Sequence, residues 1–179
     1  MSLFSRLFGP RKTAAPTLGL LDLSFGSAGE LVAADKAALG ALFSAVVEAV
    51  GAPPQCSVLL LYCTFAPDGR IEGSSLQLRD IIRASGAPIA VVATQNPAES
   101  YMAAAPQSPY GRANLVLTLN RRGAAFGRFF AALFADMKHG TTMPMAWVRL
   151  APQIPGGSHP ECPDTIFACE LGQVRLWQS

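Results

Sequence analysis

Four short apolar runs constrain the fold of this chain more than any other feature. Each is apolar along almost its whole length: LGLLDLSF, SVLLLYCTF, PIAVVATQ and ANLVLTLN, beginning at Leu18, Ser57, Pro88 and Ala113. Strands buried on both faces have this pattern, and they occur mainly in parallel sheets that helices cover. Helix-like segments separate the runs. The pattern therefore predicts an α/β fold, a three-layer sandwich with a mostly parallel sheet of about five to six strands.

The first helix-like segment runs from Glu30 to Val50 and is stopped by Gly51. Its apolar residues recur with a helical period, which predicts one helix that buries a single face. These residues are Leu39, Leu42, Phe43, Val46, Val47 and Val50. A second helix should begin after an N-cap at Ser74 or Ser75 and end at Gly86.

Three more helices are expected in the second half of the chain. A short one starts at Pro97, a residue type favoured at the first helical position. The most regular one ends at His139-Gly140 and places a row of large apolar side chains on one face: Phe126, Phe129, Phe130, Leu133, Phe134 and Met137. The last begins at Thr142 or Met143 and continues through Leu150.

The C-terminal sequence predicts an antiparallel element. TIFACE and QVRLW are two short runs joined by a Leu-Gly turn, which is typical of a hairpin at the edge of a sheet. Residues 1–17 form an amphipathic segment and linker in this interpretation, and residues 18–179 form a single domain of ordinary size.

Composition excludes several classes of protein. The net charge is only +2, too small to indicate a nucleic-acid partner. The four cysteines include no CxxC pair, so we expect no metal site. Cys63 and Cys169 lie inside apolar runs, which favours free thiols in a reducing, cytoplasmic environment; the even count leaves disulfides as the alternative. No apolar run reaches the roughly 18 residues that a membrane span needs. No glycine-rich cofactor or phosphate motif follows a strand, so no cofactor is expected.

The N-terminus carries an amphipathic pattern. Leu3, Phe4, Leu7 and Phe8 recur at helical spacing, with basic residues between and after them. One interpretation is a short anchor for a membrane surface or a groove on a partner protein. The other is a frayed end or a helix folded back on its own domain, because an isolated helix this short is marginal.

Ligands of open α/β sheets bind beyond the carboxyl ends of the strands. In this chain those ends carry small polar side chains and two arginines, which form the predicted ligand-binding set. The set comprises Ser24, Ser27, Thr64, Asp68, Thr94, Asn96, Asn120, Arg121 and Arg122. Polar loops are also simply solvated, so the two interpretations stay open.

Cys63 lies near the end of its strand and is the only predicted nucleophile. A reactive cysteine needs a base or a positive field, and His159, in a long Gly/Pro-rich loop, is the candidate base. The alternative is that Cys63 fills the core as a small apolar residue.

The succession from SVLLLYCTF to GSSLQLRDIIRASGAPIAVVAT looks like the strand-Cys, helix, strand order of CHAT domains, which are caspase-like peptidase relatives. RFFAALFADMKHGTTMPMAWVRLAPQ is similar to that family's later helix pair, so the resemblance covers Leu18 to Gln153. It implies that Cys63 occupies the nucleophile position. The family's His-Gly is replaced here by Phe25-Gly26, which implies a non-catalytic relative. A flavodoxin-like or TIR-like arrangement would give the same gross picture.

The sequence leaves three functions open. The leading hypothesis is a non-catalytic binding or interaction module of the bacterial cytoplasm that docks a protein partner, in part through its N-terminal segment. The second is a cysteine hydrolase or peptidase that uses Cys63 with His159. The third is a nucleotide or anion sensor that uses Arg121 and Arg122. A homo-oligomer is also plausible, because the last hairpin would offer an edge strand.

Overall fold

Six strands form one sheet in the computed structural model, which describes residues 15–68, 70–94, 96, 113–118, 124–150 and 165–177. The strand order is β2-β1-β3-β4-β5-β6; the first five are parallel, and β6 runs antiparallel to β5. Their bounds are Thr17–Asp22 (β1), Ala45–Val50 (β2), Val58–Tyr62 (β3), Ile89–Ala93 (β4), Asn114–Thr118 (β5) and Thr165–Cys169 (β6). The predicted mostly parallel sheet is confirmed.

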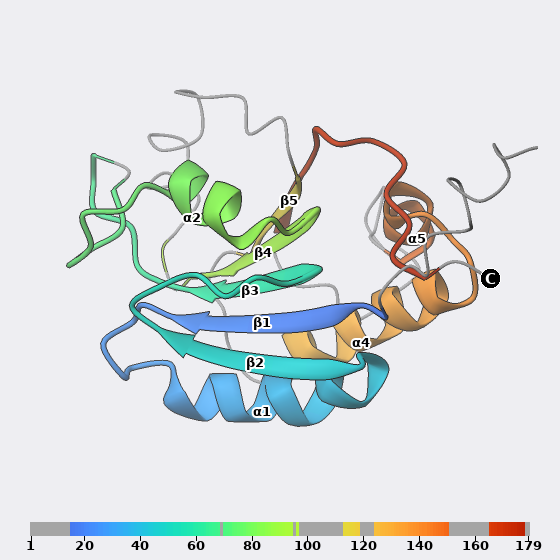
Figure 1. Cartoon of the computed structure of the whole chain (residues 1–179), viewed down its shortest axis with the longest axis horizontal. Coiled ribbons are helices and arrows are strands. Elements are labelled where there is room, and N and C mark those ends of the chain that lie inside the picture. The colour runs from blue at the N-terminus through green and yellow to red at the C-terminus, as the bar shows by residue number, and fades with distance from the viewer. Residues whose placement is uncertain are drawn as a thin grey trace, which may run out of the picture.

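Helices cover both faces of this sheet (Figure 1). Helix α2 (Leu78–Ser85) packs on one face, where Ile81 and Ile82 meet Leu59 of β3. Helices α1 (Gly29–Leu39), α4 (Ala125–Lys138) and α5 (Met143–Leu150) belong to the opposite layer. Every residue of β3, β4 and β5 is buried, which explains why these strands are apolar throughout. No helix in the described residues is long and apolar enough to cross a membrane.

The single helix predicted over residues 30–50 is wrong. Helix α1 ends at Leu39, a short 3₁₀ turn covers Gly40–Leu42, and the rest is strand β2, parallel to β1. Valines at 46, 47 and 50 fit a helical period, but their branched side chains also favour a strand. Pairing with β1 decides between the two, and β2 becomes the edge of the sheet.

The other helix predictions are mostly confirmed. Helix α2 ends at Gly86, which adopts the left-handed conformation (φ 64°) as expected. Its N-cap is Gln77, not Ser74 or Ser75, because the chain before it is still extended. The Phe-rich helix α4 has the expected face, and helices α4 and α5 have the expected bounds. The helix predicted at Pro97 and the N-terminal residues 1–14 lie outside the described residues.

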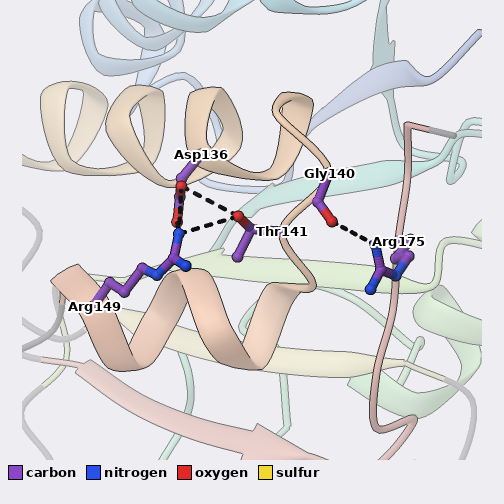
Figure 2. Close-up of polar contacts among 5 residues, drawn as sticks. All are labelled: Asp136, Gly140, Thr141, Arg149 and Arg175. Atoms are coloured by element: carbon purple, nitrogen blue, oxygen red, sulfur yellow. Dashed lines mark hydrogen bonds and ion pairs between the residues drawn. The ribbon is translucent and has the colours of Figure 1, made fainter. Parts of the chain in front are cut away.

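The antiparallel pair at the C-terminal edge consists of β5 and β6, and QVRLW forms no strand of its own. Instead, Val174 is buried and its carbonyl accepts a hydrogen bond from the Met143 amide (2.9 Å) at the start of α5. Arg175 donates to the Gly140 carbonyl at 2.5 Å (Figure 2). The C-terminal residues therefore close the corner between α4 and α5.

A polar cluster fixes the same corner from the outside (Figure 2). Arg149 of α5 forms an ion pair with Asp136 of α4 (3.1 Å), and it also donates to the Thr141 hydroxyl (3.3 Å). Thr141 in turn donates to Asp136 (3.2 Å). Since Arg149 is more than half exposed, this cluster contributes only modestly to the stability of the corner.

The connection from β2 to β3, residues 51–57, crosses β1 without a helix. Parallel strands usually need a dozen or more residues for such a crossover, so this one must pass close to the sheet. It does so over Gly19 of β1: a Cβ on Gly19 would lie 2.6 Å from the Cys56 Sγ and 2.9 Å from Pro54. The Cys56 and Ser57 amides then donate to the carbonyls of Ser85 and Thr17, respectively, which anchors the crossover.

Candidate functional site

The direction of strand addition reverses at β1, which has β2 on one side and β3 on the other. Such a reversal separates the loop after β1 from the loop after β3. It opens a crevice at the carboxyl ends of these two strands. Here those loops are the turn over residues 23–28 and the segment over residues 63–77. Both project from the same end of the sheet (Figure 1). A binding site in this fold is expected between them.

The turn after β1 is closed by its own polar side chains. Asp22 accepts hydrogen bonds from the amide (2.8 Å) and the hydroxyl (2.5 Å) of Ser24. The Ser24 hydroxyl accepts from the Ala28 amide (2.9 Å), and the Ser27 hydroxyl donates to the Ser24 carbonyl (2.9 Å). Ser24 and Ser27, both predicted ligand-binding residues, are thus brought together, and they shape the turn that leads into α1.

Phe25 stands at the tip of this turn. It is 78% exposed and is the only described residue other than glycine with a positive φ (56°). That backbone conformation is unusual for a bulky side chain and costs about 1–3 kcal/mol. The ring lies against Gly73 of the opposite loop, where a Cβ would lie 2.0 Å from the Phe25 Cζ. The turn after β1 and the loop after β3 are therefore in contact where the Phe25 ring packs on Gly73.

A groove of about 540 Å³ lies between the two loops. Its apolar wall consists of Leu23, Phe25, Val50 and Leu76. Its polar residues are Asp22, Glu72, Ser74 and Ser75, with glycines at 26, 51 and 73. Two carboxylates and no described cationic side chain line it, so its field favours an apolar or cationic group over an anion.

The loop after β3 is a small hairpin that forms the far wall. Phe65 and Ile71 form an antiparallel bridge, and the Glu72 amide donates to the Thr64 carbonyl (2.8 Å). At the exposed tip, Asp68 pairs with Arg70 (3.4 Å). The predicted residue Asp68 is therefore engaged locally with Arg70.

Asn96 ties this hairpin to β4. Its side-chain oxygen accepts from the Phe65 amide (2.7 Å), and its side-chain nitrogen donates to the Phe65 carbonyl (2.9 Å). The Thr94 hydroxyl donates to the same Asn96 oxygen (2.6 Å). Thr94 and Asn96 are thus brought together, and in the described contacts they hold the backbone of the loop.

Cys63 lies in the apolar layer beneath α2, with Leu61, Phe65 and Ile71. It is 3% exposed and does not line the groove. Burial raises the pKa of the Cys63 thiol from 9.0 to about 12. At neutral pH roughly one molecule in 100,000 would carry the thiolate that nucleophilic catalysis needs.

We therefore expect Cys63 to resist alkylation in the native protein. In iodoacetamide at neutral pH, the exposed Cys169 should be modified first, whereas Cys63 should react only when the protein unfolds or the pH approaches 12. Peptide mass mapping after timed quenching measures both rates. Modification of Cys63 faster than that of Cys169 would show an activated thiolate and would favour the hydrolase hypothesis.

Several predicted residues lie outside the described residues: His159, Asn120, Arg121 and Arg122. The proposed Cys63–His159 pair and the arginine anion site therefore stay predictions. At the end of β5, the buried Thr118 hydroxyl has no hydrogen-bond partner among the described residues. Within the described residues no cluster of three His, Cys, Asp or Glu side chains could hold a metal ion.

The groove is built mainly from residues that the sequence did not single out. Asp22, Val50, Glu72 and Leu76 were not predicted, and Phe25 was noted only because it replaces a histidine. The predicted set was chosen for its polar side chains after the strand ends. Polar side chains close turns as readily as they bind ligands. The signal that could have found Phe25 is an aromatic residue next to a glycine in the turn after β1, three residues beyond Asp22.

No family model, no curated protein and no solved structure matches this chain. The resemblance to CHAT domains therefore stays a prediction.

Proposed function

We propose that this chain is a non-catalytic binding module that docks a protein partner in the groove between the residue 23–28 turn and the residue 63–77 loop. The observation that carries the proposal is Phe25, an exposed aromatic ring held in a strained conformation over Gly73. Strain of this kind is found where the surrounding structure fixes a residue for function. The buried, protonated Cys63 supports the non-catalytic part of the proposal.

The groove has the size and chemistry of a site for one or two side chains of a polypeptide. Its volume of about 540 Å³ lies within the usual range of small binding sites. Its aliphatic wall suits an apolar side chain. The carboxylates of Asp22 and Glu72 lie in the same groove as the Phe25 ring. Carboxylates and aromatic faces both attract cations, so the groove also suits a lysine or arginine side chain. The preferred ligand is therefore an extended segment with adjacent apolar and basic residues.

The proposal retains the cytoplasmic location and the N-terminal docking segment expected from the sequence. Leu3, Phe4, Leu7 and Phe8 would give the module a second point of attachment. Two weak attachments on one chain raise the overall affinity by making the second binding event intramolecular.

Selection of random displayed peptides on the full chain tests the proposal. We expect enriched peptides to carry an apolar residue next to Lys or Arg, and we expect Phe25→Gly to weaken their binding at least about tenfold. Glu72→Lys should weaken binding of the basic peptides while sparing purely apolar ones. Fluorescence polarisation with a labelled peptide gives the dissociation constants.

Two features of the design separate binding from folding. Phe25→Gly removes the ring but also relieves the backbone strain, so its stability should match or exceed that of the wild type by up to about 1 kcal/mol. Val148→Ala is the control. Val148 is 53% exposed on α5, alanine preserves the helix, and this variant should bind the peptide normally. Selection of no peptide, or equal binding by Phe25→Gly, would contradict the proposal.

A further inference from the structure

Strand β2 is an open edge of the sheet. It pairs with β1 on one side, and no strand of the described residues pairs with its other side. Four of its six residues are exposed, among them Val47 (41%) and Val50 (89%). At the opposite edge, the first four residues of β6 are half-buried. Of the two edge strands, β2 is the more exposed, and its backbone amides and carbonyls can receive another strand.

Within the part of the chain that the structure describes, this edge lacks the usual protection against pairing. Proteins blunt such edges with proline, with a bulge or with unpaired charges, especially lysine. The sequence of β2, AVVEAV, contains no proline and one charged residue, Glu48. Glu48 forms an ion pair with Lys36 of α1, so the edge carries no net charge toward an approaching strand.

We propose that β2 is the interface of a homodimer in which two copies of the chain join their sheets through antiparallel β2 strands. A twofold axis perpendicular to the sheet keeps α1 of both copies on the same face, so residues directly opposite each other share a face. The register centred on Val47 places Val47 opposite its own copy, Glu48 opposite Val46 and Ala49 opposite Ala45. The register centred on Glu48 would oppose two carboxylates, so the first is favoured.

Helix α1 leaves room for the second copy. A strand pair alone buries less than the roughly 1,600 Å² of a standard interface, so neighbouring elements must contribute. A hollow of about 560 Å³ lies between α1 and β2, lined on the helix by Gly29, Val32, Ala33, Lys36 and Ala37. The three small residues at positions 29, 33 and 37 permit close approach of the second α1. In this dimer the contacting edge strand is β2, whereas the sequence suggested the C-terminal hairpin.

Val47→Lys tests the dimer, because it places two ammonium groups opposite each other at the twofold axis. Multi-angle light scattering on the full chain at about 100 µM should give twice the chain mass for the wild type and the single-chain mass for Val47→Lys. Val148→Lys is the matched control, an exposed valine on α5 changed in the same way, and it should remain dimeric. Circular dichroism confirms that both variants fold.

Two outcomes would overturn the proposal. One is a wild type of single-chain mass at that concentration, which would show that the edge is covered by another part of the chain or is solvated. The other is a Val47→Lys variant that is folded and still has twice the chain mass, which would place the interface elsewhere.

Discussion

Replacing Gly19 by alanine should destabilise the protein by about 2–3 kcal/mol, although alanine normally stabilises a strand relative to glycine. The reason is the short crossover from β2 to β3, which passes directly over Gly19. A Cβ there would lie 2.6 Å from the Cys56 Sγ and 3.0 Å from its Cβ. Since hydrogen bonds from Cys56 and Ser57 hold the crossover to α2 and β1, it cannot move away without losing them.

Gly29→Ala is the matched control for this prediction. Gly29 begins α1 and has no atom within 4 Å of the position that a Cβ would take. Alanine there should raise the stability by up to about 1 kcal/mol. Urea unfolding followed by circular dichroism measures both free energies of unfolding. Stabilisation by Gly19→Ala would show that the crossover does not pack on β1 as described.

Asn96→Ala should cost about 2–3 kcal/mol and should also loosen the wall of the groove. The side chain satisfies both the amide and the carbonyl of Phe65, which is 2% exposed. Alanine leaves both backbone groups without their partner, and an unsatisfied buried polar group is costly. Loss of this tie should raise amide hydrogen exchange in residues 64–72 above that in β4.

Gln77→Ala is the control for Asn96→Ala. Gln77 is an exposed amide at the N-cap of α2 with no side-chain cap hydrogen bond, so its loss should change stability by less than about 0.5 kcal/mol. Hydrogen exchange that rises equally throughout the sheet in Asn96→Ala would indicate global destabilisation and would contradict a local role for Asn96.

The layers of the fold were predictable because strands buried on both faces leave an unmistakable pattern. β3, β4 and β5 are such strands, and the face of α4 follows directly from its phenylalanines. β2 was missed because an edge strand needs few buried residues. With Val46 and Ala49 half-buried and the rest exposed, its sequence fits two periods equally well. Only the pairing with β1 distinguishes them, and that contact is not local.

The candidate site was predictable in position but not in composition. Fold class alone places it at the carboxyl ends of the strands, and the groove lies there. The hydroxyl and amide side chains of Ser24, Thr94 and Asn96 were expected to face a ligand, but their described hydrogen bonds go to loop neighbours. Backbone groups in turns compete with a ligand for hydrogen bonds to these side chains. A sequence does not reveal which of the two partners a side chain takes.

We propose that the Phe25 groove binds a polypeptide without chemistry at Cys63. The most direct test is the affinity of one selected apolar–basic peptide for the wild type, Phe25→Gly and Cys63→Ala, measured by fluorescence polarisation with intact peptide verified by mass spectrometry. We expect wild-type affinity for Cys63→Ala, binding at least about tenfold weaker for Phe25→Gly, and no cleavage of the peptide. Unchanged binding by Phe25→Gly, or peptide cleavage that Cys63→Ala abolishes, would contradict it.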